Sequence, residues 1–284
     1  MHYAARKGHS ETLTFLLEKG MKPDLADEQG YTPLLDAALG GNVAEIERLV
    51  EAGANIRAVT DSGAGIVMLA LQSLKPDVVT LAMDKGAPTD GTDPRGRTAL
   101  ELAVSNGFTD IARRLISDTD DVNKPLNAAG ATLFLEAVRS GHLAMVELML
   151  DHGADIKAKD LYGSTALMTA ASTGNALVVK YLLKTGADIK PSDNSGASAL
   201  MRAAIGNHDN IIDILLTAGA EIEHKNNEGM TALIHATQLE LLEAVQTLLD
   251  NGADINATDN YGKTSRDIAA RKGNDALTMI LQRK

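Results

Sequence analysis

The chain lacks several residue types on which common protein functions depend. Its 284 residues include no cysteine and no tryptophan, and aromatic residues make up 3% of the total. Without cysteine the chain can form neither a disulfide bond nor a thiolate metal site. So few aromatic rings are consistent with a thin stack of helices built from alanine, leucine, isoleucine and valine.

Positive charge is also scarce. Lysine and arginine number 27 against 38 acidic residues, which gives a net charge of −11. Phosphate binding requires a basic stripe, so we expect no nucleic-acid partner. No apolar run approaches the roughly 18 residues of a membrane span, and no signal peptide opens the chain. We therefore expect no membrane partner, and a cytoplasmic location is favoured.

Glycine, by contrast, recurs at a fixed spacing. Eight glycines stand 33 residues apart, with one step of 34: Gly30, Gly63, Gly96, Gly130, Gly163, Gly196, Gly229 and Gly262. If the residue three before this glycine is position 1 of a repeat, glycine also recurs at positions 15 and 27. Glycine adopts a positive φ at little cost, so these positions predict one tight turn and two helix ends per repeat. The period predicts a stack of similar units that bury their apolar sides against one another.

Alanine and large aliphatic residues recur with the same period. Position 11 is alanine in all nine repeats, and positions 23 and 24 are bulky, as in Leu182 and Leu183. A methyl group lets two helices approach closely. We therefore expect the first helix of each repeat to be slim and the second helix to supply the core volume.

These motifs resemble the ankyrin repeat, whose period and T-P-L-H-x-A signature match. The signature reads YTPLLDAA over residues 31–38, STALMTAA over 164–171 and MTALIHA over 230–236, and the family's ending GADINA stands at 252–257. The resemblance covers the whole chain. It implies an all-α ankyrin-repeat solenoid, in which helix–turn–helix pairs are joined by short β-hairpin loops.

The period predicts a single array over residues 1–284. Its expected parts are a partial repeat 1–26, repeats 27–59, 60–92, 93–126, 127–159, 160–192, 193–225 and 226–258, and a C-terminal cap 259–284. Arg266 stands where other repeats carry leucine, which suits a capping repeat that faces water. Met1 falls inside a first helix, so we expect further repeats or another domain before it; a frayed half repeat is the alternative.

Three places depart from the period. Leu74 replaces the glycine of position 15, residues 117–126 contain one additional residue, and Leu239 and Glu240 replace another turn. Stacked repeats can open locally at a weak junction. We expect residues 118–126 to exchange amide protons faster than residues 186–189.

The sequence offers no convincing catalytic or metal-binding pattern. Residues 262–264 resemble the end of a phosphate loop, but Ala257 stands where that loop needs glycine. Asn123 and Asn256 resemble asparagines that are hydroxylated in other ankyrin repeats, although a turn-forming role explains both. We predict no catalytic residue and no cofactor. We also predict no metal site, because the recurring histidines His9, His142 and His208 lie in different repeats, about 10 Å or more apart.

The remaining candidate for function is the surface. The resemblance implies a groove, formed by hairpin tips and first helices, that binds proteins. We predict contact residues at the tips: Tyr31, Arg95, Arg97, Leu161, Tyr162, Met230 and Tyr261. The alternative is that these side chains pack on the neighbouring hairpin.

We therefore expect a monomeric, non-catalytic scaffold for a protein or peptide. Basic patches on that partner would suit the net charge of −11. The alternative function is a regulatory or targeting arm of a larger enzyme, toxin or channel whose other part lies before Met1.

Overall fold

The computed structural model describes residues 1–117 and 120–282. Its contacts divide the chain into two compact units, unit 1 (Met1–Asp120) and unit 2 (Asp121–Lys284). The division falls inside the irregular segment 117–126. Residues 118 and 119 lie outside the described residues, so the expected fast exchange of 118–126 stays a prediction, as does the single array.

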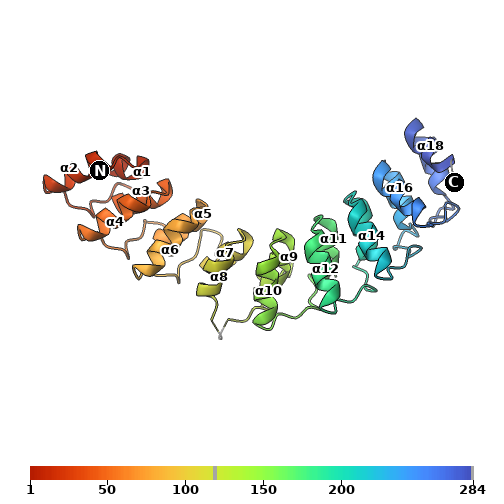
Figure 1. Cartoon of the computed structure of the whole chain (residues 1–284), viewed down its shortest axis with the longest axis horizontal. Helices are drawn as coiled ribbons and strands as arrows, with labels where there is room; N and C mark the ends of the chain where they lie inside the picture. Colours follow the sequence, from red (N-terminus) through yellow and green to blue (C-terminus); the bar gives the residue numbers. More distant parts are fainter. Residues whose placement is uncertain (118–119, 283–284) are drawn as a thin grey trace. The chain divides into compact units, whose positions relative to one another are not determined.

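Unit 1 consists of helix pairs, coloured red to yellow in Figure 1. In each pair an odd-numbered first helix packs against an even-numbered second helix, and successive first helices pack against one another. The helices are α1 (His2–Lys7), α2 (Ser10–Glu18), α3 (Pro33–Gly40), α4 (Val43–Glu51), α5 (Ile66–Gln72), α6 (Pro76–Asp84), α7 (Ala99–Ser105) and α8 (Thr109–Leu115).

Unit 2 repeats this arrangement. Its helices are α9 (Leu133–Ser140), α10 (Leu143–Asp151), α11 (Ala166–Ser172), α12 (Ala176–Lys184), α13 (Ala199–Ile205), α14 (Asp209–Thr217), α15 (Ala232–Gln238), α16 (Leu242–Asp250), α17 (Ser265–Lys272) and α18 (Asp275–Gln282).

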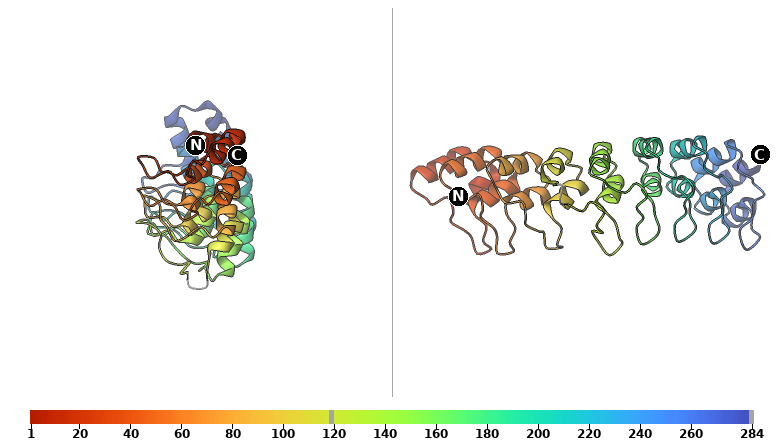
Figure 2. Two further views of the ribbon diagram at one scale, coloured as in Figure 1. Left: turned by 90° about the vertical axis from the view of Figure 1, so that its left-hand side faces the viewer. Right: turned by 90° about the horizontal axis from the view of Figure 1, so that it is seen from below.

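Among the described residues, five of the loops between pairs are closed by a single antiparallel bridge. Such bridges join Val59 to Gly65 in unit 1 and Lys159 to Thr165 in unit 2. In each unit these loops project from the helices, as the right-hand view of Figure 2 shows. The part of the chain that the structure describes contains eighteen helices and no extended strand, which confirms the all-α repeat prediction.

Most first helices begin at a threonine or serine of position 6. The side chain of Thr165, for example, accepts a hydrogen bond from the backbone N–H of Met168 at 3.3 Å. This bond satisfies one of the backbone donors that a helix start leaves free. Gly65 stands at this position before α5 and offers no such side-chain bond.

The turn between the two helices of a pair requires a left-handed residue at position 15. The glycines at this position have φ between 70° and 80°. Among the described residues, three that are not glycine also have positive φ, and all three lie at position 15: Leu74 (56°), Asn207 (55°) and Glu240 (59°). The fold therefore imposes this conformation even where the sequence lacks glycine.

The core lies within and between the pairs. Every alanine of position 11 is at most 4% exposed. Large side chains such as Phe134, Leu148 and Leu167 are fully enclosed around these alanines. First helices can thus approach closely, which places their exposed faces and the hairpins beside one another.

Candidate functional site

The predicted tip residues differ in exposure. Leu161, Tyr162 and Tyr261 are 69%, 65% and 82% exposed. Arg95 is also exposed, whereas Tyr31 and Arg97 are half-buried.

Met230 does not lie at the surface as expected. It is 5% exposed and packs with Ile234 of α15 and Ile268 of α17. Ala64 and Ala197, at the same position 5, are also buried. Position 5 directly precedes the N-cap of a first helix, and in these three repeats its side chain is buried, so Met230 has little surface to offer a partner.

The hairpin tips of unit 2 are joined by a row of hydrogen bonds that we call the tip ladder. The backbone N–H of position 2 donates to the carbonyl oxygen of position 3 in the preceding repeat. These bonds are Leu161 to Ala129 (2.9 Å), Asn194 to Tyr162 (2.9 Å), Asn227 to Ser195 (3.0 Å) and Asn260 to Glu228 (3.0 Å).

Asparagine side chains extend the tip ladder. The Nδ2 atom of Asn194 donates to the carbonyl oxygen of Leu161 at 2.9 Å. Asn227 and Asn260 repeat this bond to the preceding asparagine, at 2.9 and 3.0 Å. The tips of Asn194, Asn227 and Asn260 are therefore held to the previous tip by both backbone and side chain. The two bonds from Asn194 support the backbone that carries Leu161 and Tyr162.

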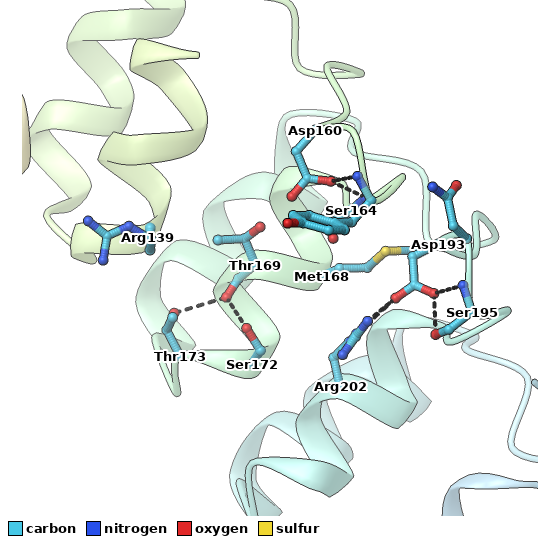
Figure 3. Close-up of a pocket in the computed structure, with 12 residues that line it drawn as sticks. Arg139, Asp160, Ser164, Met168, Thr169, Ser172, Thr173, Asp193, Ser195 and Arg202 are labelled. Atoms are coloured by element: carbon cyan, nitrogen blue, oxygen red, sulfur yellow. Dashed lines mark hydrogen bonds and ion pairs between the residues drawn. The ribbon is translucent and has the colours of Figure 1, made fainter. Parts of the chain in front are cut away.

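A hollow of about 610 Å³ lies beside these tips in unit 2, and we call it the groove (Figure 3). The groove is lined by first helices and by two hairpins. Its residues are Arg139 of α9; Met168, Thr169 and Ser172 of α11, with Thr173; Arg202 of α13; and the hairpin residues Asp160, Tyr162, Ser164, Asp193, Asn194 and Ser195.

A buried ion pair supports one wall of the groove. One oxygen of Asp193 accepts hydrogen bonds from the backbone N–H groups of Ser195 (2.8 Å) and Ala197 (3.0 Å). The other accepts from Nε of Arg202 at 2.9 Å. Burial opposes the charged form, but hydrogen bonds from Ser195 and Arg202 outweigh burial and lower the pKa of Asp193. The sequence analysis did not identify this ion pair, whose two members lie nine residues apart.

The hydroxyl groups of the groove donate their protons to the protein itself. Thr169 donates to the carbonyl of Thr165 at 3.1 Å, and Ser172 and Thr173 donate to the carbonyl of Thr169 at 2.9 and 3.0 Å. Figure 3 shows the bonds of Ser172 and Thr173 to Thr169 as dashed lines. A hydroxyl has one donor and two acceptor lone pairs, so these groups present acceptors to an occupant, and Thr173 does so with the lone pair that is left after it accepts from Nδ2 of Asn175 at 2.8 Å.

Arg139 lies at the other side of the groove. Its Nε donates to Glu136 at 2.9 Å within α9, and this hydrogen bond raises the pKa of Arg139. Both arginines of the groove thus already have carboxylate partners.

Unit 1 has a smaller hollow at the same repeat positions, which we call the unit 1 hollow. It measures about 310 Å³ and is lined by Asp93, Arg95, Arg97, Gln72 and Asn106 among others. The Nε atom of Arg97 donates to Asp93 at 2.8 Å. The side chain of Arg95 makes no hydrogen bond or ion pair within residues 1–117 and 120–282. This hollow therefore contains a free cation.

Within 1–117 and 120–282, histidine, aspartate and glutamate form no group of three or more suited to a metal ion. In the same ranges, no helix combines the length and apolarity needed to cross a bilayer.

Comparison with known proteins gives one consistent family. A family model of ankyrin repeats (three copies) matches residues 1–60, 67–160, 134–226 and 218–284. The chain is 33% identical over 155 residues to the ankyrin repeat and KH domain-containing protein mask-1 of Caenorhabditis elegans, which is 52% of this chain and 6% of that protein.

Two further relatives show the same partial coverage. A transient receptor potential cation channel subfamily A member 1 homolog of Caenorhabditis elegans is 31% identical over 120 residues, 42% of this chain and 10% of that protein. The human B-cell lymphoma 3 protein is 32% identical over 143 residues, 48% of this chain and 32% of that protein. The chain thus matches about a third or less of the length of these relatives.

Proposed function

The chain belongs to the ankyrin-repeat family, a general protein–protein interaction module, and from this premise we propose that the groove of unit 2 binds a segment of a protein partner. The family is generally non-catalytic, and the proposal is a scaffold without catalysis. The segment would lie on the first helices α9, α11 and α13 and contact the tip residues Leu161 and Tyr162.

The observation that carries the proposal is a pair of exposed apolar side chains on a supported backbone. Leu161 and Tyr162 are 69% and 65% exposed. The carbonyl groups of both residues accept hydrogen bonds from Asn194, at 2.9 Å each. Tyrosine is a frequent anchor of protein interfaces, and a held backbone reduces the entropy lost on binding. Tyr162 also lines the groove, so the anchor and the hollow form one surface.

The test begins with the intact chain as bait and identification of its partners by mass spectrometry. The dissociation constant of each purified partner is then measured by isothermal titration calorimetry. We expect the double variant Leu161→Ala, Tyr162→Ala to bind at least about tenfold more weakly, as for an interface anchor.

A matched control comes from the second-helix layer. Leu177 of α12 is 70% exposed and does not line the groove. Leu177→Ala should leave the affinity unchanged, and circular dichroism should show the helices of all variants intact. Equal affinity of the double variant and the parent chain would overturn the proposal.

The lengths of the relatives favour a second candidate, in which the array is the regulatory or targeting arm of a longer protein. The matched stretches are 6% and 10% of two relatives, one of them named as a cation channel. The gene sequence upstream of Met1 tests this candidate. A continuous reading frame that encodes a further domain would support it, and a stop codon directly before Met1 would defeat it.

A further inference from the structure

We propose that the groove takes an arginine side chain of its partner segment, with the free carboxylate oxygen of Asp160 as the acceptor. This inference rests on the proposed function, because it names the chemistry of the segment that the same groove would bind.

The protein contains two internal examples of this pairing. Asp93 and Asp193 both stand at position 1 of their repeats. In each, one oxygen accepts the N–H groups of the hairpin turn and the other accepts the Nε of an arginine, at 2.8 Å from Arg97 and 2.9 Å from Arg202. The second oxygen of a position 1 aspartate is therefore placed to receive a guanidinium.

Asp160 has the same turn but no internal cation. Its Oδ1 atom accepts from the backbone N–H groups of Tyr162 (2.9 Å) and Ser164 (2.8 Å). Its Oδ2 atom accepts no hydrogen bond from any residue that the structure describes. Thr169 stands at position 10, where the next repeat has Arg202. The groove therefore has a carboxylate oxygen with no guanidinium to receive (Figure 3).

The surroundings of Asp160 favour a donor-rich cation. The hydroxyl groups of Thr169, Ser172 and Thr173 present acceptors, because their protons are donated to backbone carbonyls. The exposed ring of Tyr162 offers a face on which a guanidinium can stack.

The charges that line the groove also favour a cation. Arg139 is paired with Glu136, and Arg202 is paired with Asp193. Glu136 does not itself line the groove but neutralises Arg139, so Asp160 is the remaining charged residue of the lining and its negative charge is unmatched. A single arginine would match it.

Elsewhere the chain already carries asparagine in place of aspartate at position 1. Asn226 stands at position 1 of another repeat, and its Oδ1 atom accepts the same two turn bonds, from Glu228 (2.9 Å) and Met230 (3.0 Å). Asp160→Asn should therefore keep the hairpin and remove only the charge. Asp259 makes the same turn bonds, two residues before Tyr261, and does not line the groove, so Asp259→Asn is the matched control.

The experiment is a nuclear magnetic resonance titration of the full, isotope-labelled chain. The probes are five-residue peptides Ac-Ala-Ala-X-Ala-Ala-NH2, with arginine, lysine, citrulline, norleucine or glutamate as X. We expect the arginine peptide to shift the amide signals of Tyr162, Ser164 and Thr169. Because a single contact binds weakly, the peptide is added up to about 10 mM. Citrulline is a neutral analogue of arginine, and its peptide should bind at least about fivefold more weakly.

The variants decide whether Asp160 is responsible. Asp160→Asn should weaken the arginine peptide at least about fivefold, while Asp259→Asn should bind it like the parent chain. Equal binding of the citrulline peptide, a glutamate peptide that binds more tightly, an unaffected Asp160→Asn variant, or no shift in the groove would each overturn the inference.

The outcomes separate this inference from the proposed function. If a purified partner depends on Leu161 and Tyr162 but not on the charge of Asp160, the arginine site is wrong and groove binding stands. If the arginine peptide binds as expected but the groove variants bind purified partners with unchanged affinity, the proposed function is wrong and only the arginine site is supported.

Discussion

The hairpin tips of unit 2 are joined to one another more completely than those of unit 1. In unit 2 the tip ladder links successive tips by backbone bonds, and asparagine side chains add a second bond at Asn194, Asn227 and Asn260. In unit 1 the corresponding backbone bond runs from Asp61 to Gln29 at 3.1 Å, and Pro94 at the next position 2 has no N–H to donate. The residue at position 2 of the repeat therefore decides whether a tip is hydrogen-bonded to the preceding tip.

The two hollows differ in the same way. The groove of unit 2 has an unmatched carboxylate at Asp160, whereas the unit 1 hollow has an unmatched guanidinium at Arg95. The same aspartate of position 1 stands in both. The role of this aspartate depends on whether an arginine reaches its second oxygen, either from the same hairpin, as Arg97 does, or from the first helix that follows, as Arg202 does. A shared repeat thus provides the frame, and a few neighbouring side chains set the chemistry.

The largest expected effect comes from copying the proline of unit 1 into unit 2. Asn194→Pro removes both ladder bonds of this residue and should destabilise the tip by about 2 kcal/mol, the sum of two net hydrogen bonds. Asn194→Ala removes only the side-chain bond and should cost about half as much. Hydrogen exchange of residues 160–166, followed by mass spectrometry, measures the effect. Unchanged protection in the proline variant would show that the tip ladder does not support this hairpin.

A comparable loss should follow removal of the buried carboxylate of Asp193. Asp193→Asn leaves Arg202 without its partner and should lower the free energy of unfolding by about 2 kcal/mol at neutral pH. Because the pKa of Asp193 is lowered in the folded chain, its contribution is present above the unfolded pKa of about 3.9 and is lost as the pH falls through the folded value.

The pH dependence separates this explanation from simple loss of packing. Urea unfolding at a series of pH values should show the difference between the parent chain and Asp193→Asn shrinking progressively as the pH is lowered from about 5 to about 2. A difference that is constant over this range would contradict the ion-pair explanation. Asp93→Asn should show the same convergence in unit 1, since the pKa of Asp93 is also lowered, with burial opposing the effect of Arg97.

A smaller effect, opposite in sign between the units, is expected at position 15. Leu74 has a φ of 56° and is 60% exposed, so Leu74→Gly relieves strain and loses little packing. We expect about 1 kcal/mol of stabilisation. Asn207 tolerates this conformation better, and its side chain accepts the N–H of Ala244 at 3.1 Å, so Asn207→Gly should destabilise by about 1 kcal/mol. Thermal unfolding followed by circular dichroism measures both, and the same sign in both variants would contradict the comparison.

Much of the fold could be predicted from the sequence because residues with the same structural role recur at the same position in successive repeats. Glycine at position 15 predicted the left-handed turn, and alanine at position 11 predicted a slim first helix that the second helix of the repeat can approach closely. The exposure of Leu161 and Tyr162 also followed from their place in a turn. These features depend on neighbours within one repeat.

The parts of the site that escaped prediction depend on side-chain direction across repeats. Met230 was counted as a tip residue, but position 5 turns its side chain toward Ile268 of the next first helix. The pairing of Asp193 with Arg202 links a hairpin to a helix nine residues on, which periodicity alone does not reveal. The asparagines of the tip ladder recur every 33 residues and were visible in the sequence. Their bonds became evident only once neighbouring tips were placed side by side.

We propose that a partner lies on the first helices and tips of unit 2 and not on the second-helix layer. A photo-reactive benzoylphenylalanine at exposed Ser172 of α11, compared with the same group at exposed Leu177 of α12, tests it directly with a purified partner. We expect a covalent adduct from position 172 and none from position 177. An adduct from position 177 alone would contradict it.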